Sequence, residues 1–206
     1  MQLSLFFVLK AALIFLITFG DSFPQGEDIA IASTIAGLIV YILVRFVYWR
    51  KETRSVPSFF NVSGVQVVTY GLGLGIVAAF TGYLNLLVIL RTKIFTADLE
   101  GSMNYFGTGA WWGVALMVVA VPVFEEFIFR GLLFAGLKKT WSLRRSVLAS
   151  SLLFAIFHPP MFVIPSFLLG LMTALSYART KALVVPVVVH GTYSFLMFMF
   201  SKNLLA

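Results

Sequence analysis

Four ionisable side chains of the kinds used in enzyme active sites occur in apolar stretches of this 206-residue chain. Glu125 and Glu126 are adjacent, and His158 and His190 are its two histidines. An ionisable group at the centre of a bilayer costs at least about 2.5–3.5 kcal/mol on insertion scales. Each of these residues therefore needs a reason to be there. Two carboxylates and two imidazoles can bind a metal ion or activate a water molecule.

Helical spacing places the two glutamates on different faces. Each residue advances about 100° around an α-helix. Glu126 and Arg130 are four residues apart, so they share a face and can form an ion pair. Glu125 points about 100° away from that face and needs a different partner. A carboxylate without a nearby cation in an apolar site has its charged form disfavoured, which suits a general base.

Two schemes for hydrolysis of an acyl bond fit these residues, and the sequence leaves both open. In the first, Glu125, His158 and His190 hold one Zn²⁺, whose fourth position is left for water. In the second, which needs no metal, Glu125 and His158 activate water. His190 then donates to the oxyanion of the tetrahedral intermediate. Ser194 follows His190 by four residues, so it lies on the same helix face and could be a second donor.

Each of these residues also has a purely structural interpretation. Glu126 and Arg130 could form a buried structural pair. His190 could be a core histidine bonded to a neighbouring helix, and His158 could simply end a helix before two prolines. Their depth favours a shared site. At 1.5 Å per residue, Glu125 and His158 lie about 20 Å from the nearest basic loop and His190 about 14 Å.

The composition is that of a membrane protein. Hydrophobic residues make up 60% of the chain and charged residues 11%, whereas soluble domains are about a quarter charged. Cysteine is absent, which excludes disulfides, thiolate metal sites and a cysteine nucleophile. The net charge of +7 is typical of basic cytoplasmic loops. No basic patch interleaved with aromatic residues indicates nucleic-acid binding.

The sequence predicts an all-α fold, a polytopic bundle of about seven transmembrane helices. A span needs about 20 mostly apolar residues, and the predicted spans are residues 3–19, 29–49, 62–90, 111–137, 146–158, 162–178 and 182–200. The chemistry-bearing residues fall in the last four of these. Residues 1–110 are therefore predicted to be helices without catalytic motifs and residues 111–206 the catalytic core, within one membrane domain.

Basic residues are unevenly distributed among the predicted loops. Nine lie on the side of the N-terminus and three on the opposite side. Because cytoplasmic loops are rich in Lys and Arg, we expect a multi-pass protein of the cytoplasmic membrane with its N-terminus inside. The stretch from Gly71 to Gly75 reads Gly-Leu-Gly-Leu-Gly and lies in mid-span. It is expected to serve close helix packing rather than phosphate binding.

Three motifs follow one another in these spans: EExxxR at 125–130, FxxxH at 154–158 and the start of HxxxN at 190–194. In this order, inside apolar stretches, they resemble the CPBP family of intramembrane proteases. That family includes the Rce1-type CAAX prenyl endopeptidases and the Abi family of bacteriocin-processing or immunity proteins. The resemblance covers about residues 111–200.

The resemblance implies an all-helical membrane fold with a cavity open toward cytoplasm and lipid. It also implies endopeptidase activity on a membrane-associated peptide or protein, including prenylated CAAX-type or leader-peptide substrates. Glu125 and His158 would activate water, and His190 and the last motif residue would stabilise the oxyanion. A metalloprotease label is also attached to the family, so one Zn²⁺ and a metal-free site both stay open. Ser194 stands where the family usually has Asn, and its hydroxyl has a shorter reach.

Two other functions compete with proteolysis. A non-catalytic membrane scaffold or immunity protein of the same fold would tolerate substitution of Glu125 and His158 without loss of function. A proton-linked transporter would also place carboxylates within the membrane. It would normally have an internal repeat, and the sequence shows none. The expected partners are membrane lipids and a membrane-associated substrate.

Overall fold

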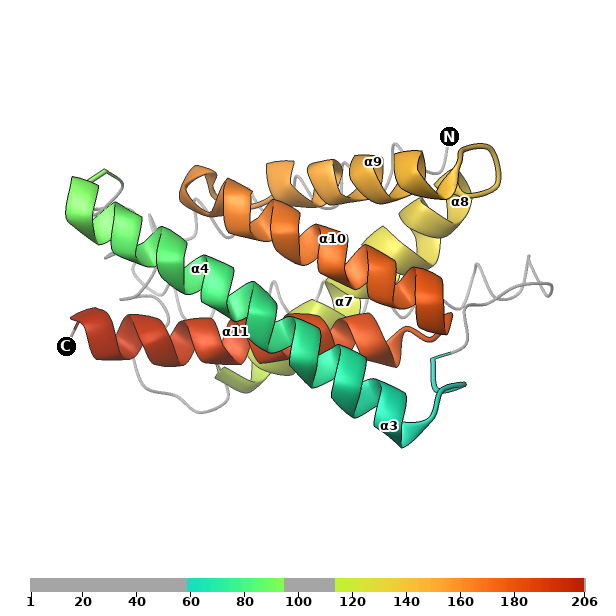
Figure 1. The fold of residues 1–206 in the computed structure, drawn as a ribbon, viewed down its shortest axis with the longest axis horizontal. Helices are drawn as coiled ribbons and strands as arrows, with labels where there is room; N and C mark the ends of the chain where they lie inside the picture. Colours follow the sequence, from blue (N-terminus) through green and yellow to red (C-terminus); the bar gives the residue numbers. More distant parts are fainter. Residues whose placement is uncertain (1–58, 95–113, 206) are drawn as a thin grey trace, which may run out of the picture. The chain divides into compact units, whose positions relative to one another are not determined.

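The computed structural model describes residues 59–94 and 114–205, which lie in one compact unit, Pro57–Ala206. The predicted spans 3–19 and 29–49 and the predicted boundary between residues 110 and 111 fall outside the described residues. Every regular element in the described part is a helix (Figure 1). The all-α prediction is confirmed for these residues.

Two long continuous helices, three further α-helices and one short 3₁₀ turn make up most of the described chain. The first combines α3 (Gly64–Gln66), η1 (Val67–Leu72) and α4 (Gly73–Thr92). The second combines η2 (Leu116–Ala120), α7 (Val121–Glu126), η3 (Phe127–Phe134) and α8 (Ala135–Leu137). Then follow α9 (Leu143–Ile156), the short 3₁₀ turn η4 (Pro160–Phe162), α10 (Val163–Thr180) and α11 (Val184–Leu205). The elements η1, η2 and η3 are wound as π-helix, a form that is often found at functional sites.

Three described helices are long and apolar enough to cross a membrane: Gly64–Thr92, Pro160–Thr180 and Val184–Leu204. They correspond to the predicted spans 62–90, 162–178 and 182–200. Helix α9 has 14 residues, or about 21 Å, which is less than the roughly 30 Å of a hydrocarbon core. The helix that ends at Leu137 carries three charged residues. The prediction of seven spans is therefore not confirmed.

The helix ends follow the local sequence. Ser63 and Gln66 form a capping box at the start of α3, in which each side chain accepts a hydrogen bond from the backbone N–H of the other. Helix α9 ends just before Pro159 and Pro160, since proline lacks the N–H that would continue the helix. His158 therefore lies outside the regular helix, two residues after the end of α9.

Helix α11 is held between two others at points where only glycine fits. A Cβ atom on Gly75 of α4 would lie 2.8 Å from the carbonyl oxygen of Val189. A Cβ on Gly191 of α11 would lie 2.6 Å from the carbonyl oxygen of Val118 in η2. Gly71 makes a similar approach to α11, whereas a Cβ on Gly73 would meet nothing within 4 Å. The predicted packing role of this glycine stretch is confirmed for its first and last members.

The two ends of the described helices differ in charge. Figure 1 shows the end of α8, the start of α9, the end of α10 and the start of α11 at one end. Six basic residues lie there: Lys138, Lys139, Arg144, Arg145, Arg179 and Lys181. Arg91, Lys93 and Lys202 lie at the other end. Burial lowers the pKa of Lys181, and the neighbouring charge of Lys138 lowers it further.

Candidate active site

The second long helix presents Glu126 and Arg130 to the interior. The two side chains are fully buried, and the Nε atom of Arg130 lies 3.0 Å from Oε2 of Glu126. This is the pairing that the four-residue spacing predicts. Leaving water costs an ion several kcal/mol, so a buried pair needs further hydrogen bonds to be stable.

Helix α10 provides those further contacts for Arg130. Its Nε donates to the hydroxyl oxygen of Thr173 at 3.0 Å. Its Nη2 donates to the carbonyl oxygen of Gly170 at 3.2 Å and also to the Thr173 hydroxyl. The guanidinium carbon lies 5.0 Å from the ring centroid of Phe154 in α9, within range of a cation–π interaction. Arg130 thus joins its own helix to α9 and α10.

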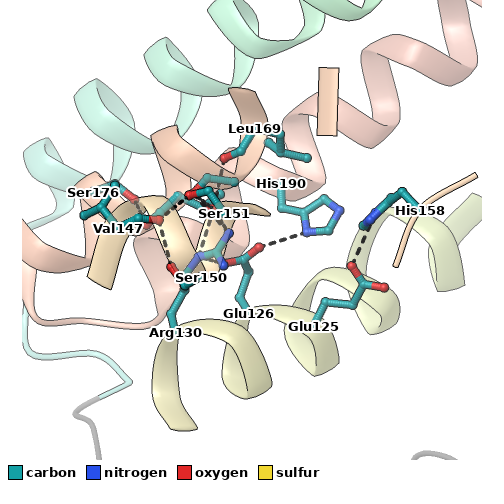
Figure 2. Close-up of polar contacts among 12 residues, drawn as sticks. Glu125, Glu126, Arg130, Val147, Ser150, Ser151, His158, Leu169, Ser176 and His190 are labelled. Carbon is teal, nitrogen blue, oxygen red and sulfur yellow. Dashed lines mark hydrogen bonds and ion pairs between the residues drawn. The ribbon is translucent and has the colours of Figure 1, made fainter. Parts of the chain in front are cut away.

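The other oxygen of Glu126 contacts the second histidine. Nδ1 of His190, in α11, lies 3.1 Å from Oε1 of Glu126 (Figure 2). In its ion pair with Arg130, Glu126 is a carboxylate and can only accept, so Nδ1 of His190 carries the hydrogen. In the neutral ring, Nε2 of His190 then has a lone pair available. A carboxylate that fixes a histidine ring in this way is common behind metal ligands.

The first histidine is oriented by a backbone group. Nδ1 of His158 lies 2.8 Å from the carbonyl oxygen of Phe154. A carbonyl can only accept, so Nδ1 carries the hydrogen and Nε2 of the neutral ring is an acceptor. That Nε2 faces Oε2 of Glu125 at 3.6 Å (Figure 2). These two side chains are 20% and 15% exposed, while Glu126 and Arg130 are fully buried.

The structure brings together Glu125 of α7, His158 of the turn after α9 and His190 of α11. Each offers one potential ligand atom, and these atoms all lie within 4.8 Å of one another. One carboxylate and two imidazoles are a common ligand set of catalytic zinc sites. Glu126 and the Phe154 carbonyl supply the supporting hydrogen bonds that such ligands usually have. The donor set therefore fits a divalent ion such as Zn²⁺.

Ser194 is less closely connected to this cluster. It lies one turn after His190 on α11 and is half-buried. Within the described part of the chain, no hydrogen bond links Ser194 to Glu125, His158 or His190. Its link to the cluster is its position one helical turn after His190, not a hydrogen bond with the three side chains.

The structure adds residues that the motifs do not contain. Thr173 and Gly170 hold Arg130, as described above. Asn85 of α4 donates from Nδ2 to the carbonyl oxygen of Met161 at 2.9 Å, in the turn that directly follows His158. Asn85 is the one asparagine in the predicted spans, and a lone amide in mid-span is a signal that could have marked it. Thr173 gives no such signal, because many threonines in membrane helices bond only to their own backbone.

Comparison with known proteins agrees with the three motifs. Residues 107–196 match the family model described as Type II CAAX prenyl endopeptidase Rce1-like. This segment contains every residue of the cluster and all three motifs. The resemblance inferred from the motifs is therefore confirmed over this segment.

A relative in Bacillus subtilis (strain 168) is described as "Putative membrane peptidase YdiL". It is 27% identical over 179 residues, an alignment that covers 78% of this chain and 66% of the relative. The chain thus spans just under two thirds of that relative's length. No solved structure matches the chain. The two matches and the apolar helices support a membrane protein with a protease-type function.

Proposed function

We propose that this protein is an intramembrane endopeptidase in which Glu125 and His158 activate the water molecule that attacks a peptide bond. The observation that carries this proposal is the approach of Oε2 of Glu125 to Nε2 of His158 at 3.6 Å, inside an apolar helical bundle. Both atoms are acceptors when Glu125 is ionised and His158 is neutral. Two acceptors at this distance repel each other unless a proton, a donor or a cation lies between them.

A water molecule satisfies this requirement, because it can donate one hydrogen to each acceptor. As the water oxygen attacks the scissile carbonyl carbon, one proton passes to Glu125. The new C–O bond forms, and the carbonyl π-electrons move to the oxygen. Collapse of this tetrahedral intermediate breaks the C–N bond, and Glu125 returns the proton to the departing amine. His158 stays neutral throughout and orients the water.

The tautomer of His190 constrains its role in the reaction. Since Nδ1 donates to Glu126, a neutral His190 presents a lone pair at Nε2 and cannot donate to an oxyanion. In the metal-free scheme, donation to the oxyanion therefore requires a hydrogen on both ring nitrogens of His190. In the metal scheme, Glu125, His158 and His190 would be the ligands. A Zn²⁺ bound there would polarise the carbonyl and lower the pKa of its water.

The proposed substrate is a peptide or protein held at the membrane, of the prenylated CAAX or leader-peptide type. The family match supports a prenylated substrate. The partial exposure of Glu125 and His158 supports access from one side, while Glu126 and Arg130 are closed off. The six basic residues at one end of the helices favour that end as the cytoplasmic one, which would place the N-terminus inside.

The proposal is tested by reconstituting the protein in liposomes and measuring cleavage of a quenched fluorescent, farnesylated peptide and of an unprenylated leader peptide. Glu125→Gln and His158→Ala are each expected to abolish cleavage while circular dichroism and size-exclusion profiles stay unchanged. Lys202→Gln, which removes an exposed charge at the far end of α11, is the control and should cleave normally. Retained cleavage in either cluster variant would contradict the proposal and favour a scaffold or immunity protein.

A further inference from the structure

Helix α10 carries none of the three motifs, yet it holds the buried arginine on which the cluster depends. We infer that Thr173 is a positioning residue: through Arg130 and Glu126, its hydroxyl keeps the ring of His190 oriented with its Nδ1–H directed at Glu126, as both hydrolysis schemes require. This inference rests on the proposed function. Figure 2 shows the contacts that run from α10 to α11 through Arg130, Glu126 and His190.

The first step is the hydroxyl of Thr173 itself. It is fully buried and its hydrogen points to its own helix, where the carbonyl oxygens of Leu169 and Gly170 lie at 3.0 and 3.2 Å. Its oxygen is therefore left to accept from both Nε and Nη2 of Arg130. A hydroxyl oxygen has two lone pairs, so one threonine meets two guanidinium donors.

The second step is the sharing of Nε of Arg130. This donor lies 3.0 Å from Thr173 Oγ1 and 3.0 Å from Glu126 Oε2. The orientation of the guanidinium therefore sets the orientation of the carboxylate. The other carboxylate oxygen then accepts from Nδ1 of His190 at 3.1 Å. The contacts of Thr173 with Arg130 and of Glu126 with His190 are hydrogen bonds, and the contact between Arg130 and Glu126 is a fully buried ion pair.

The third step is the fixed position of α10 at this level. A Cβ atom on Gly170 would lie 3.0 Å from the Cα atom of Ser151 in α9. The two helices are thus in close contact at the residue whose carbonyl accepts from Arg130. Because α10 cannot shift toward α9, Thr173 and Gly170 form a rigid acceptor pair for the guanidinium.

The variant Thr173→Val keeps the shape of the side chain and removes the hydroxyl. Arg130 would then lose the hydroxyl that accepts from its Nε and one of the two acceptors of its Nη2. The guanidinium would rotate toward the acceptors that remain. Glu126 would follow, and His190 would populate the other tautomer. Loss of supporting contacts behind active-site ligands typically costs 10–100-fold in activity. We expect kcat to fall about tenfold with KM nearly unchanged, because a buried Thr173 cannot touch the substrate.

The experiment compares Thr173→Val with Thr173→Ser, which keeps the hydroxyl, and with Ser166→Ala, which removes another buried hydroxyl of α10. Each is assayed for kcat and KM. Each is also labelled with ¹⁵N-histidine and studied by NMR, which distinguishes Nδ1–H from Nε2–H. The chain has two histidines, so a His158→Gln sample assigns the His190 signals.

The expected result is a fall in kcat and a mixed His190 tautomer for Thr173→Val, with wild-type values for Thr173→Ser and Ser166→Ala. A wild-type spectrum and kcat for Thr173→Val, or equal impairment of Thr173→Ser, would overturn the inference. If the valine variant does not fold, Thr173→Ala repeats the test without the added methyl group. Absence of cleavage by the wild-type protein would count against the proposed function alone, since the spectra still decide the role of Thr173.

Discussion

Glu125 and Glu126 are neighbours in sequence but lie in opposite environments. Glu126 is fully buried, with Arg130 at 3.0 Å on one oxygen and His190 at 3.1 Å on the other. Glu125 is 15% exposed and faces His158 at the longer distance of 3.6 Å. One carboxylate is thus held by close, charge-complementary contacts, while the other faces an acceptor across a gap.

The difference shows how one helix can give two adjacent glutamates different roles, one in orienting a histidine and the other in proton transfer. A rotation of about 100° per residue is enough to direct adjacent side chains to different neighbours. The carboxylate with a cation keeps its charge and orients a histidine. The carboxylate that faces His158 is placed to take up and return a proton. Substitutions at the two positions should therefore fail in different ways.

Glu125→Gln should give the largest change in activity. An amide cannot accept the proton of water as a base, and general acid–base groups contribute about 10²–10⁴-fold. We expect kcat to fall by about 10³-fold with the unfolding midpoint unchanged, because this side chain is partly exposed and replaced by one of equal size. Steady-state cleavage and thermal unfolding in the same detergent measure both quantities. If Glu125→Gln lost its activity because it unfolds, Glu125 would have a structural role like that of Glu126, and the proposed difference between the two glutamates would be wrong.

Glu126→Gln should give the largest change in stability. It leaves the buried charge of Arg130 without a counter-charge, and breaking a buried pair typically costs about 3–5 kcal/mol. Denaturant unfolding in mixed micelles would measure the free energy. The double variant Glu126→Gln/Arg130→Met removes the orphaned charge and should recover part of the loss. A single variant as stable as the wild type would show that the pair does not stabilise the fold.

Gly75→Ala tests the packing that fixes α11 and with it His190. The added methyl would approach the Val189 carbonyl at 2.8 Å and the Thr192 side chain at 2.5 Å, and overpacking of this kind costs about 1–3 kcal/mol. Gly73→Ala is the matched control two residues away, where a Cβ meets nothing within 4 Å. Its stability should equal or slightly exceed that of the wild type, as alanine is the better helix former. Equal melting curves for the two variants would contradict the close contact.

The cluster was more predictable from sequence than the fold around it. Ionisable residues are so costly within a membrane that Glu125, His158 and His190 stand out on composition alone, and the Glu126–Arg130 pair follows from helical spacing. The tautomers of the histidines did not follow, since they depend on the Phe154 carbonyl and on Glu126 across 64 residues of chain.

The expected helix count depended on a weaker signal. An apolar run shows that a segment avoids water, but not whether lipid or protein surrounds it. Residues 146–158 read as a span, yet α9 is 14 residues long and buries a serine-rich face, including Ser146, Ser150 and Ser151. Its length reflects the break at the two prolines. Contacts made by ordinary residues, such as Thr173 with Arg130, are set by tertiary packing and have no local pattern.

Asn85→Leu should have a smaller effect, on the turn behind His158. The substitution keeps the size of the side chain and removes the donor to the Met161 carbonyl at 2.9 Å. A typical hydrogen bond contributes about 0.5–1.5 kcal/mol, so we expect a loss of about 1 kcal/mol and a fall in kcat of a few fold. Thr92→Val is the control: it removes a hydroxyl that bonds to Val88 and Ile89 of its own helix and to Ile94 just after it, far from His158 in sequence. An unchanged kcat in Asn85→Leu would show that the turn holds its position without α4.

Ser194→Ala should have the smallest effect of the series. A side chain that stabilises the oxyanion typically contributes 10²–10³-fold, but Ser194 is half-buried and forms no hydrogen bond with the cluster in the described part of the chain. We therefore expect less than about a threefold change in kcat, whereas Ser194→Asn, which restores the longer side chain usual in the family, should raise it. Paired measurements of kcat for the alanine and asparagine variants decide the point. A fall of 100-fold or more in Ser194→Ala would mean that the serine reaches the reacting carbonyl once substrate is bound. The active site would then extend from His190 one helical turn further along α11, to Ser194.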